Sequence, residues 1–397
     1  MSRSAGRHFL QIPGPSAVPD RILRAIAGQV IDHRGPSFAD VGTRALEGMK
    51  TIFKTEAGRV FIYPASGTGA WEAALVNTMS EGDRVLMYET GHFATLWMKM
   101  ARRLGFRPEF IEGDWRGGAD ADRIADALRA HTERTIKAVC VVHNETSTGS
   151  VSPIAEVRAA IDAAGHPALL MVDTISGLAS IDFRFDEWCV DVAVSGSQKG
   201  LMLPPGISFN AVSDKAMAAS RGAGLRRSYW DWADMAGPND SGYFPYTPAT
   251  NMLYGLNEAI AMLHEEGLEN VFARHQRHGA ATRAAVRAWG LEVLCRRQGQ
   301  ESGVLTAVVV PEGHSADAFR ATALEHYDIS LGNGLGKVSD RVFRIGHLGD
   351  FNDLMLIGTL SGVEMALGLA RVPHAKGGVN AALELLGQPL RQPTAAE

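Results

Sequence analysis

The chain has 397 residues, of which 43 are glycine and 17 are proline, and its formal net charge is −5. These two residue types together stay well below the roughly 25–30% that marks low-complexity sequences, so the glycine excess belongs to an ordered protein. The length exceeds what one hydrophobic core usually supports, which predicts two domains. The sequence contains no basic tract, and we therefore expect neither a nucleic acid nor a membrane surface as a partner.

Two features of the sequence predict a cytoplasmic location. The N-terminal segment lacks the apolar stretch of a secretory signal, and no apolar run approaches the roughly 18 residues of a membrane-spanning helix. The three cysteines cannot all pair with one another, and Cys140 and Cys189 lie in apolar segments. We expect both to be reduced residues of the core.

Short apolar runs alternate with helical patterns along the first two thirds of the chain. The predicted strands are 60–63, 84–87, 108–111, 136–142, 168–172, 190–194 and 207–212, and the predicted helices are 70–79, 93–104, 121–131 and 153–164. The strands are continuously apolar, which indicates a mostly parallel sheet with helices on both faces. Ligands of such sheets bind beyond the carboxyl ends of the strands, so the residues that follow each strand are candidates for function.

The last third of the chain predicts a smaller α/β domain. It follows an aromatic, turn-rich stretch at 228–250 that is longer than an ordinary connection. The predicted helices are 251–266, 268–289, 315–327 and 352–369, and the predicted strands are 291–295, 305–310 and 341–345. The sequence after Pro373 has little pattern, and we expect it to be loosely held.

A glycine-rich turn follows the first of these strands. Ser66-Gly67-Thr68-Gly69 lies between the strand at 60–63 and a helical pattern. Glycines let the backbone approach an anion closely, and a helix N-terminus offers free N–H groups and the positive end of a dipole. The turn is therefore a candidate phosphate site. The alternative is a tight strand-to-helix turn in which Thr68 is the N-cap.

Two other strand ends carry ionisable residues. Asp173 ends the strand at 168–172, where a carboxylate would face the ligand crevice. Lys199 follows the strand at 190–194 within Ser195-Gly196-Ser197-Gln198-Lys199-Gly200 and is bordered by apolar sequence. Apolar surroundings lower the pKa of a lysine and make it a nucleophilic amine, whereas an ordinary surface lysine is the alternative.

The phosphate turn, the strand-end carboxylate and the strand-end lysine together match the needs of pyridoxal 5′-phosphate. At this point the sequence resembles the class V aminotransferases of fold-type I, and among them most of all the serine–glyoxylate and alanine–glyoxylate aminotransferases. The resemblance extends from Pro13 to about Ala370. Its specific segments are SGTGAWEAAL at 66–75, HNETSTG at 143–149, DVAVSGSQKG at 191–200 and VFRIGHLG at 342–349.

The resemblance implies a fold and a division of the chain. The fold is α/β, with a large domain built on a mostly parallel seven-stranded sheet and a smaller C-terminal α/β domain. The expected parts are an N-terminal arm at 1–20, a large cofactor-binding domain at 21–256 and a small domain at 257–397. A homodimer with shared active sites is also implied.

The resemblance further implies roles for single residues. Lys199 would hold the cofactor covalently and move the proton of the reaction, and Asp173 would pair with the ring nitrogen. The other implied cofactor contacts are Ser66, Gly67, Thr68 and Gln198 at the phosphate, Phe93 stacked on the ring, Thr146 beside the ring oxygen, and Tyr243 and Thr247 reaching the phosphate of the partner subunit. The substrate carboxylate would meet Arg344, the backbone of Gly14 and Thr146.

The implied reaction is a ping-pong transamination between an amino acid and a 2-oxo acid. L-Serine and glyoxylate would give 3-hydroxypyruvate and glycine through the pyridoxamine phosphate form. Alanine–glyoxylate or serine–pyruvate transamination is the alternative, because a methyl and a hydroxymethyl group differ by few pocket contacts. A binding protein that keeps the fold without turnover is a different class. A cysteine desulfurase is disfavoured because none of the three cysteines lies on a glycine-rich loop.

Two other patterns suggest further sites. His275 and His278 share one face of a predicted helix, but no third ligand has a suitable spacing, so a solvated helix face is favoured over a metal site. Gly332, Gly334 and Gly336 suggest a nucleotide loop, although strand patterns lie on both sides. A flexible turn that presents Lys337 or shapes substrate access is favoured instead.

Overall fold

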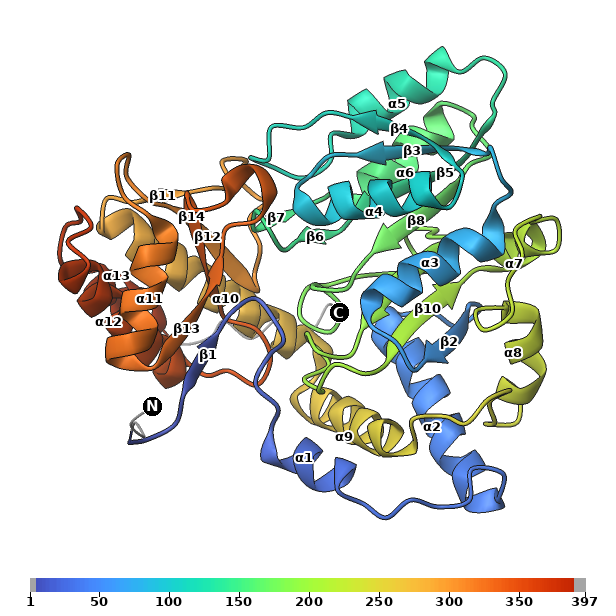
Figure 1. Ribbon diagram of the computed structural model, residues 1–397, viewed down its shortest axis with the longest axis horizontal. Helices are drawn as coiled ribbons and strands as arrows, with labels where there is room; N and C mark the ends of the chain where they lie inside the picture. Colours follow the sequence, from blue (N-terminus) through green and yellow to red (C-terminus); the bar gives the residue numbers. More distant parts are fainter. Residues whose placement is uncertain (1–4, 389–397) are drawn as a thin grey trace.

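The computed structural model describes residues 5–388, which form two large sheets, each covered by helices, and one short two-stranded sheet (Figure 1). Within these residues no helix combines the length and the hydropathy that crossing a membrane requires. The chain begins on the small sheet, continues into the large sheet and its helices, and returns to the small sheet for its C-terminal part.

The large sheet has seven strands, and all of its pairings are parallel except those of β10. In spatial order the strands are β2 (Arg59–Tyr63), β10 (Ser208–Val212), β9 (Val192–Gly196), β8 (Leu169–Asp173), β5 (Ile136–Val142), β3 (Arg84–Tyr88) and β4 (Arg107–Ile111). β10 runs antiparallel to both β2 and β9. The predicted mostly parallel seven-stranded sheet is confirmed.

Helices cover the large sheet on both sides, which explains why its strands are continuously apolar. One face packs against α2 (Pro36–Phe53), α5 (Ala121–Ala130), α6 (Ile154–Ala163) and α9 (Thr250–Glu266), with the short α1 (Asp20–Ile26) beside α9. The other face packs against α3 (Gly67–Thr78), α4 (His92–Arg103), α7 (Asp214–Ser220) and α8 (Trp232–Asn239). Within β2, Ile62 faces the first core and Phe61 faces the second.

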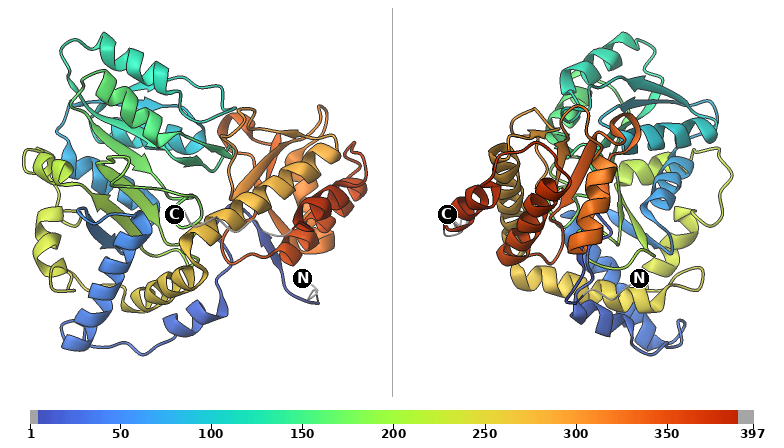
Figure 2. Two further views of the ribbon diagram at one scale, coloured as in Figure 1. Left: turned by 180° about the vertical axis from the view of Figure 1, so that it is seen from behind. Right: turned by 60° about the vertical axis from the view of Figure 1, so that its left-hand side comes forward.

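The small sheet combines the two ends of the described chain. Its strand order is β1 (Phe9–Gln11), β13 (Ile329–Asn333), β14 (Val342–Gly346), β12 (Leu305–Val309) and β11 (Glu292–Val293). Helices α10 (Leu268–Ala288), α11 (Ala316–Tyr327), α12 (Asp353–Leu369) and α13 (Gly378–Leu386) form its core, and α10 extends from the end of α9 along this unit (Figure 2). The short pair β6 (Asn144–Glu145) and β7 (Ser150–Val151) and the 3-10 turn η1 (Gly336–Val338) complete the elements.

The N-terminal strand β1 pairs in parallel with β13, so residues 9–11 belong to the small sheet. The predicted boundary at 256/257 falls inside helix α9, which continues without a break from Thr250 to Glu266. The three-part division of the chain therefore stays a prediction, although two separate sheets are present.

Three expectations from the sequence are wrong. The segment after Pro373 is not loose throughout, because α13 packs against the small core through Ala382 and Leu386. Cys189 is exposed rather than part of the core, whereas Cys140 is buried as expected. His275 and His278 do not lie on a solvated face, because both side chains are buried where α10 meets the chain after β14.

Candidate active site

Lys199 lies in the loop that follows β9, at the carboxyl edge of the large sheet. Its Nζ atom donates a hydrogen bond to the carbonyl oxygen of Pro13 at 2.7 Å. Burial and, to a lesser extent, the positive charge of Arg344 lower the pKa of Lys199 to about 8, although the negative charge of Asp173 acts in the opposite sense. The free amine, the nucleophilic and basic form, is therefore more accessible near neutral pH than for an ordinary lysine.

Asp173 is the last residue of β8, the strand next to β9, and is 3% exposed. Its Oδ2 atom accepts a hydrogen bond from Nε1 of Trp71 at 3.0 Å, and its Oδ1 atom accepts one from the backbone N–H of Ile175 at 2.7 Å. Burial raises the pKa of Asp173 to about 7, and Glu145 raises it as well, whereas the two hydrogen bonds and Lys199 lower it. The carboxylate is oriented from two sides and is poised to pair with a cation.

The glycine-rich turn forms a cradle at the N-terminus of α3. Ser66 is in the N-cap position, and neither its hydroxyl nor that of Thr68, which is exposed, makes a cap hydrogen bond. Gly67 is buried, and a Cβ there would lie 2.5 Å from Cδ1 of Ile175. Across the cradle, a Cβ at Gly196 would lie 3.4 Å from the N atom of Gly67. The alternative with Thr68 as N-cap is therefore not what the structure shows.

Gln198 borders the same cradle. A Cβ at Gly196 would lie 3.1 Å from Oε1 of Gln198, and that oxygen is buried with no hydrogen-bond partner among the described residues. Because the amide O and N of glutamine are assigned from the surrounding network, the orphaned end can equally present its NH₂ group. The first turn of α3 also offers free backbone N–H groups. The cradle is therefore polar and lets a phosphate come close to the backbone.

Arg344 lies on β14 in the small sheet and is 6% exposed. Its Nε atom donates to the carbonyl oxygen of Asn333 at 2.8 Å, and its Nη1 atom donates to the carbonyl oxygen of Thr146 at 2.8 Å. Burial lowers the pKa of Arg344 to about 10, and the negative charge of Glu145 raises it. The guanidinium therefore connects β13 of the small sheet with the turn between β6 and β7, and its Nη2 atom has no partner among the described residues.

Gly14 lies directly against Lys199. Its backbone has φ of +104°, and a Cβ there would overlap the Lys199 side chain. Ser16 holds the same stretch of chain, because its hydroxyl donates to the carbonyl oxygen of Lys199 at 2.9 Å. The N-terminal segment thus covers the lysine, as expected for a residue that closes over the substrate.

Phe93 lies in the first turn of α4, where its backbone N–H donates to Oε1 of Glu145 at 3.3 Å. Glu145 is fully buried and also accepts from the N–H of Ala94 and from the hydroxyl of Ser147. Sequence reasoning gave no role to Glu145, although it stands inside the HNETSTG segment. Its carboxylate fixes the N-terminus of α4 and so the placement of Phe93.

Tyr243 and Thr247 are not brought to this cluster within one chain. The Tyr243 hydroxyl donates to the carbonyl oxygen of Gly35 at 3.4 Å, and its ring stacks on Phe38 with 6.4 Å between centroids. Thr247 is exposed. Their predicted contact with a partner subunit stays a prediction.

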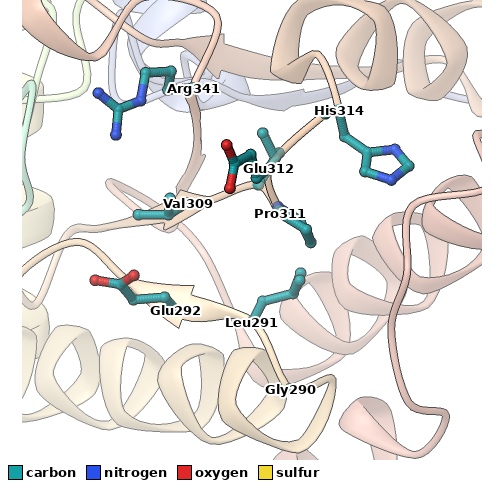
Figure 3. Close-up of a pocket in the computed structure, with 10 residues that line it drawn as sticks. Gly290, Leu291, Glu292, Val309, Pro311, Glu312, His314 and Arg341 are labelled. Atoms are coloured by element: carbon teal, nitrogen blue, oxygen red, sulfur yellow. The ribbon is translucent and has the colours of Figure 1, made fainter.

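A hollow of about 750 Å³ lies elsewhere, on the small sheet beside β11 and β12 (Figure 3). Glu292, Glu312, His314 and Arg341 are among the residues that line it. None of the sequence-predicted site residues lines it, and we place the active site at Lys199 on chemical grounds.

Comparisons with known proteins agree with this geometry. The family described as "Aminotransferase class-V" matches residues 9–341. The chain belongs to the class-V aminotransferase family. It is 49% identical over 371 residues to a serine–glyoxylate aminotransferase of Methylorubrum extorquens, which covers 92% of each chain. It is 46% identical over 386 residues to an L-aspartate–glyoxylate aminotransferase of Paracoccus denitrificans, covering 97% of this chain and 96% of that one.

The fold agrees as well. The crystal structure of a pyridoxamine–pyruvate aminotransferase from Mesorhizobium loti matches with a TM-score of 0.90 at 27% identity, covering 97% of this chain and 99% of that one. This aminotransferase has the fold-type I architecture, uses pyridoxal 5′-phosphate, and takes an amino acid and a 2-oxo acid as substrates. The orphaned side-chain amide of Gln198, turned to present its NH₂ group, and the cradle at Gly67 fit the phosphate of that cofactor, and the amine of Lys199 fits its aldehyde.

Proposed function

We propose that this aminotransferase transfers the amino group of L-serine to glyoxylate and forms 3-hydroxypyruvate and glycine. One observation carries the proposal: the partly buried Lys199 and the buried Asp173 and Arg344 share one site in a chain that is 49% identical to a serine–glyoxylate aminotransferase. All four reactants are small monocarboxylates, and a single carboxylate-binding guanidinium suits each of them.

Each residue has a proposed task. When bound, pyridoxal phosphate accepts the electron pair that is left when the α-proton of the amino acid departs. Lys199, with its lowered pKa, removes and returns that proton as a positioned base. Asp173 stabilises positive charge at the ring nitrogen, and Arg344 holds the substrate carboxylate through its free Nη2 edge.

The remaining cofactor contacts follow from the cradle. Ser66, Gly67, Thr68 and Gln198 would hold the phosphate, Phe93 would contact the ring, and Thr146 would contact the ring oxygen and the substrate. Gly14 closes over the substrate carboxylate from the N-terminal segment. Arg344 fixes Thr146 through its carbonyl oxygen, which supports placing both near the substrate.

The same proposal includes a homodimer in the cytoplasm. Thr247 is exposed and Tyr229, in the same aromatic stretch at 228–250, is 43% exposed, which supports a surface that a partner subunit covers. Light scattering of the purified holoenzyme tests the dimer, and cell fractionation tests the location. A monomer with full activity would contradict the shared site.

Steady-state kinetics decide between donors. Serine, alanine and aspartate are each paired with glyoxylate and with pyruvate, and kcat/KM is compared. We expect serine with glyoxylate to have the highest value. The relative from Paracoccus denitrificans makes aspartate the second candidate, and a higher kcat/KM for aspartate or alanine than for serine would contradict the proposal.

The Lys199→Ala variant tests the site itself. We expect it to lose the absorbance of covalently held cofactor and the transamination activity together. Persistence of the covalent cofactor would remove Lys199 from its proposed role, and unchanged cofactor absorbance of the wild type on adding serine would favour a non-catalytic binding protein.

A further inference from the structure

The loop between β13 and β14 carries the glycine pattern noted in the sequence, and it lies against the large sheet. Gly336 begins η1 with φ of +54°, in the left-handed region that favours glycine. A Cβ there would lie 3.0 Å from the Trp115 ring and 3.1 Å from Nδ1 of His92. Because Trp115 and His92 belong to the chain around the large sheet, this loop is a contact between the two units.

Lys337 fastens the loop at this contact. Its Nζ atom lies 2.5 Å from Oε1 of Glu89 and 5.5 Å from the centroid of the Trp115 ring. Glu89 follows β3, and its side chain is 6% exposed, while that of Lys337 is 63% exposed. Nε1 of Trp115 donates to the same Glu89 oxygen at 3.0 Å. The pair therefore combines a solvent-facing cation with a buried anion, and removing the cation would leave the anion uncompensated.

The other end of the same loop holds Arg344. Asn333, the last residue of β13, accepts the hydrogen bond from Nε of Arg344 through its carbonyl oxygen. Three residues separate Asn333 from Lys337, so the lysine and the carbonyl that orients Arg344 belong to one short turn. The guanidinium thus receives one orienting contact from this turn and the other from Thr146 across the interface.

We propose that Lys337 and Glu89 form an inter-domain latch that positions the Arg344 guanidinium for the carboxylate of both substrates. This proposal rests on the proposed function, in which Arg344 binds that carboxylate. Lys337 is a positioning residue: it acts through Asn333 and Arg344 and leaves the proton transfer at Lys199 untouched. Opening of the latch weakens substrate binding more than it slows the chemical step.

The test uses the holoenzyme and three single substitutions. Lys337→Met removes the cation and keeps the apolar stem, and Glu89→Gln removes the anion and keeps an acceptor for Trp115. We expect either variant to raise the KM for serine and for glyoxylate by roughly threefold to tenfold, with kcat within about twofold of the wild type. Lys337→Arg keeps the charge, and we expect it to restore a KM near that of the wild type.

A matched control lies at a second tie between the two sheets. Nη1 of Arg116 lies 2.7 Å from Oε1 of Glu292 on the edge strand β11, and β12 separates that strand from β14, which carries Arg344. We expect Arg116→Met to leave the KM unchanged. An equal rise in KM for Arg116→Met and Lys337→Met would overturn the latch, because a general loosening of the contact between the two units would then explain the rise.

The double variant and one further substitution complete the design. If the two residues act as one pair, Lys337→Met combined with Glu89→Gln raises KM no more than either change alone, and a multiplicative effect would overturn the pairing. Thermal melts verify that each variant is folded. An unchanged KM in both Lys337→Met and Glu89→Gln overturns the latch but not the proposed function. An unchanged KM in Arg344→Lys overturns the carboxylate site of the proposed function.

Discussion

The hydrogen bond from Trp71 to Asp173 gives the sharpest prediction. Both side chains are 3% exposed, and Nε1 of Trp71 lies 3.0 Å from Oδ2 of Asp173. The change Trp71→Phe removes this donor and keeps an aromatic ring against Trp97, on which Trp71 stacks with 5.9 Å between centroids. We expect the variant to hold a proton on Asp173 to higher pH than the wild type.

The magnitude follows from the strength of the bond. A hydrogen bond to an ionised group contributes about 1.5–3 kcal/mol, which corresponds to about one to two pH units of pKa. The pKa of Asp173 in the protein without cofactor is about 7, so the variant is expected to titrate at about 8 to 9. A folded-state pKa above the unfolded value of 3.8 gives stability that is fully present below 3.8 and is lost as the pH rises through the folded-state pKa.

The assay is urea unfolding of the cofactor-free protein between pH 7 and pH 9. The contribution of Asp173 levels off near pH 7 in the wild type, whereas in Trp71→Phe it continues to fall by about 1.4 kcal/mol per pH unit. Trp97→Phe is the matched control, because the buried Nε1 of Trp97 has no hydrogen-bond partner among the described residues. The same pH dependence in both variants would refute the reasoning.

Three further predictions follow from the site and its surroundings. Arg344→Lys cannot keep both the Asn333 and the Thr146 hydrogen bonds, and we expect the KM for glyoxylate to rise by roughly tenfold or more, measured by steady-state kinetics. Gly14→Ala places a Cβ at φ of +104° against Lys199, which should lower the unfolding free energy by about 1–2 kcal/mol in urea titrations and reduce kcat/KM. Burial lowers the pKa of His275 to about 3 from 6.5, so its stability contribution is present above pH 6.5 and is lost as the pH falls; His275→Asn should flatten the fall in unfolding free energy between pH 6 and pH 4 by about 1.4 kcal/mol per pH unit.

Much of the site could be predicted because parallel strands bring their carboxyl ends to one edge. Asp173 and Lys199 are separated in sequence. They become neighbours in space because each follows or ends one of two adjacent parallel strands, β8 and β9. Arg344 was predicted from the resemblance to the family, and the structure brings its charge within reach of Lys199. The order of the strands was not predicted, because apolar runs alone do not specify which strands pair.

Other features depend on packing that the local sequence does not encode. His275 and His278 lie three positions apart on a helix with many polar residues, a pattern typical of a solvated face. His275 is nevertheless buried, and its Nε2 atom accepts a hydrogen bond from the backbone N–H of Gly349 in the chain after β14. The short α13 packs against α10 and against the side chain of Trp289, the residue that follows α10, beside Gly378. Such long-range contacts decide the outcome for weakly patterned segments.

The chemistry of the site depends on these surroundings more than on residue identity. The side chain of Lys337 is 63% exposed and stays hydrated, whereas Lys199 loses that hydration and its pKa is lowered. Burial also opposes the charge on Asp173, and the fully buried Glu145 opposes it further. Trp71 and Ile175 donate the hydrogen bonds that work against both effects. The tryptophan of the AWEAAL segment therefore helps to keep the carboxylate charged, a dependence visible only once β8 and α3 are packed together.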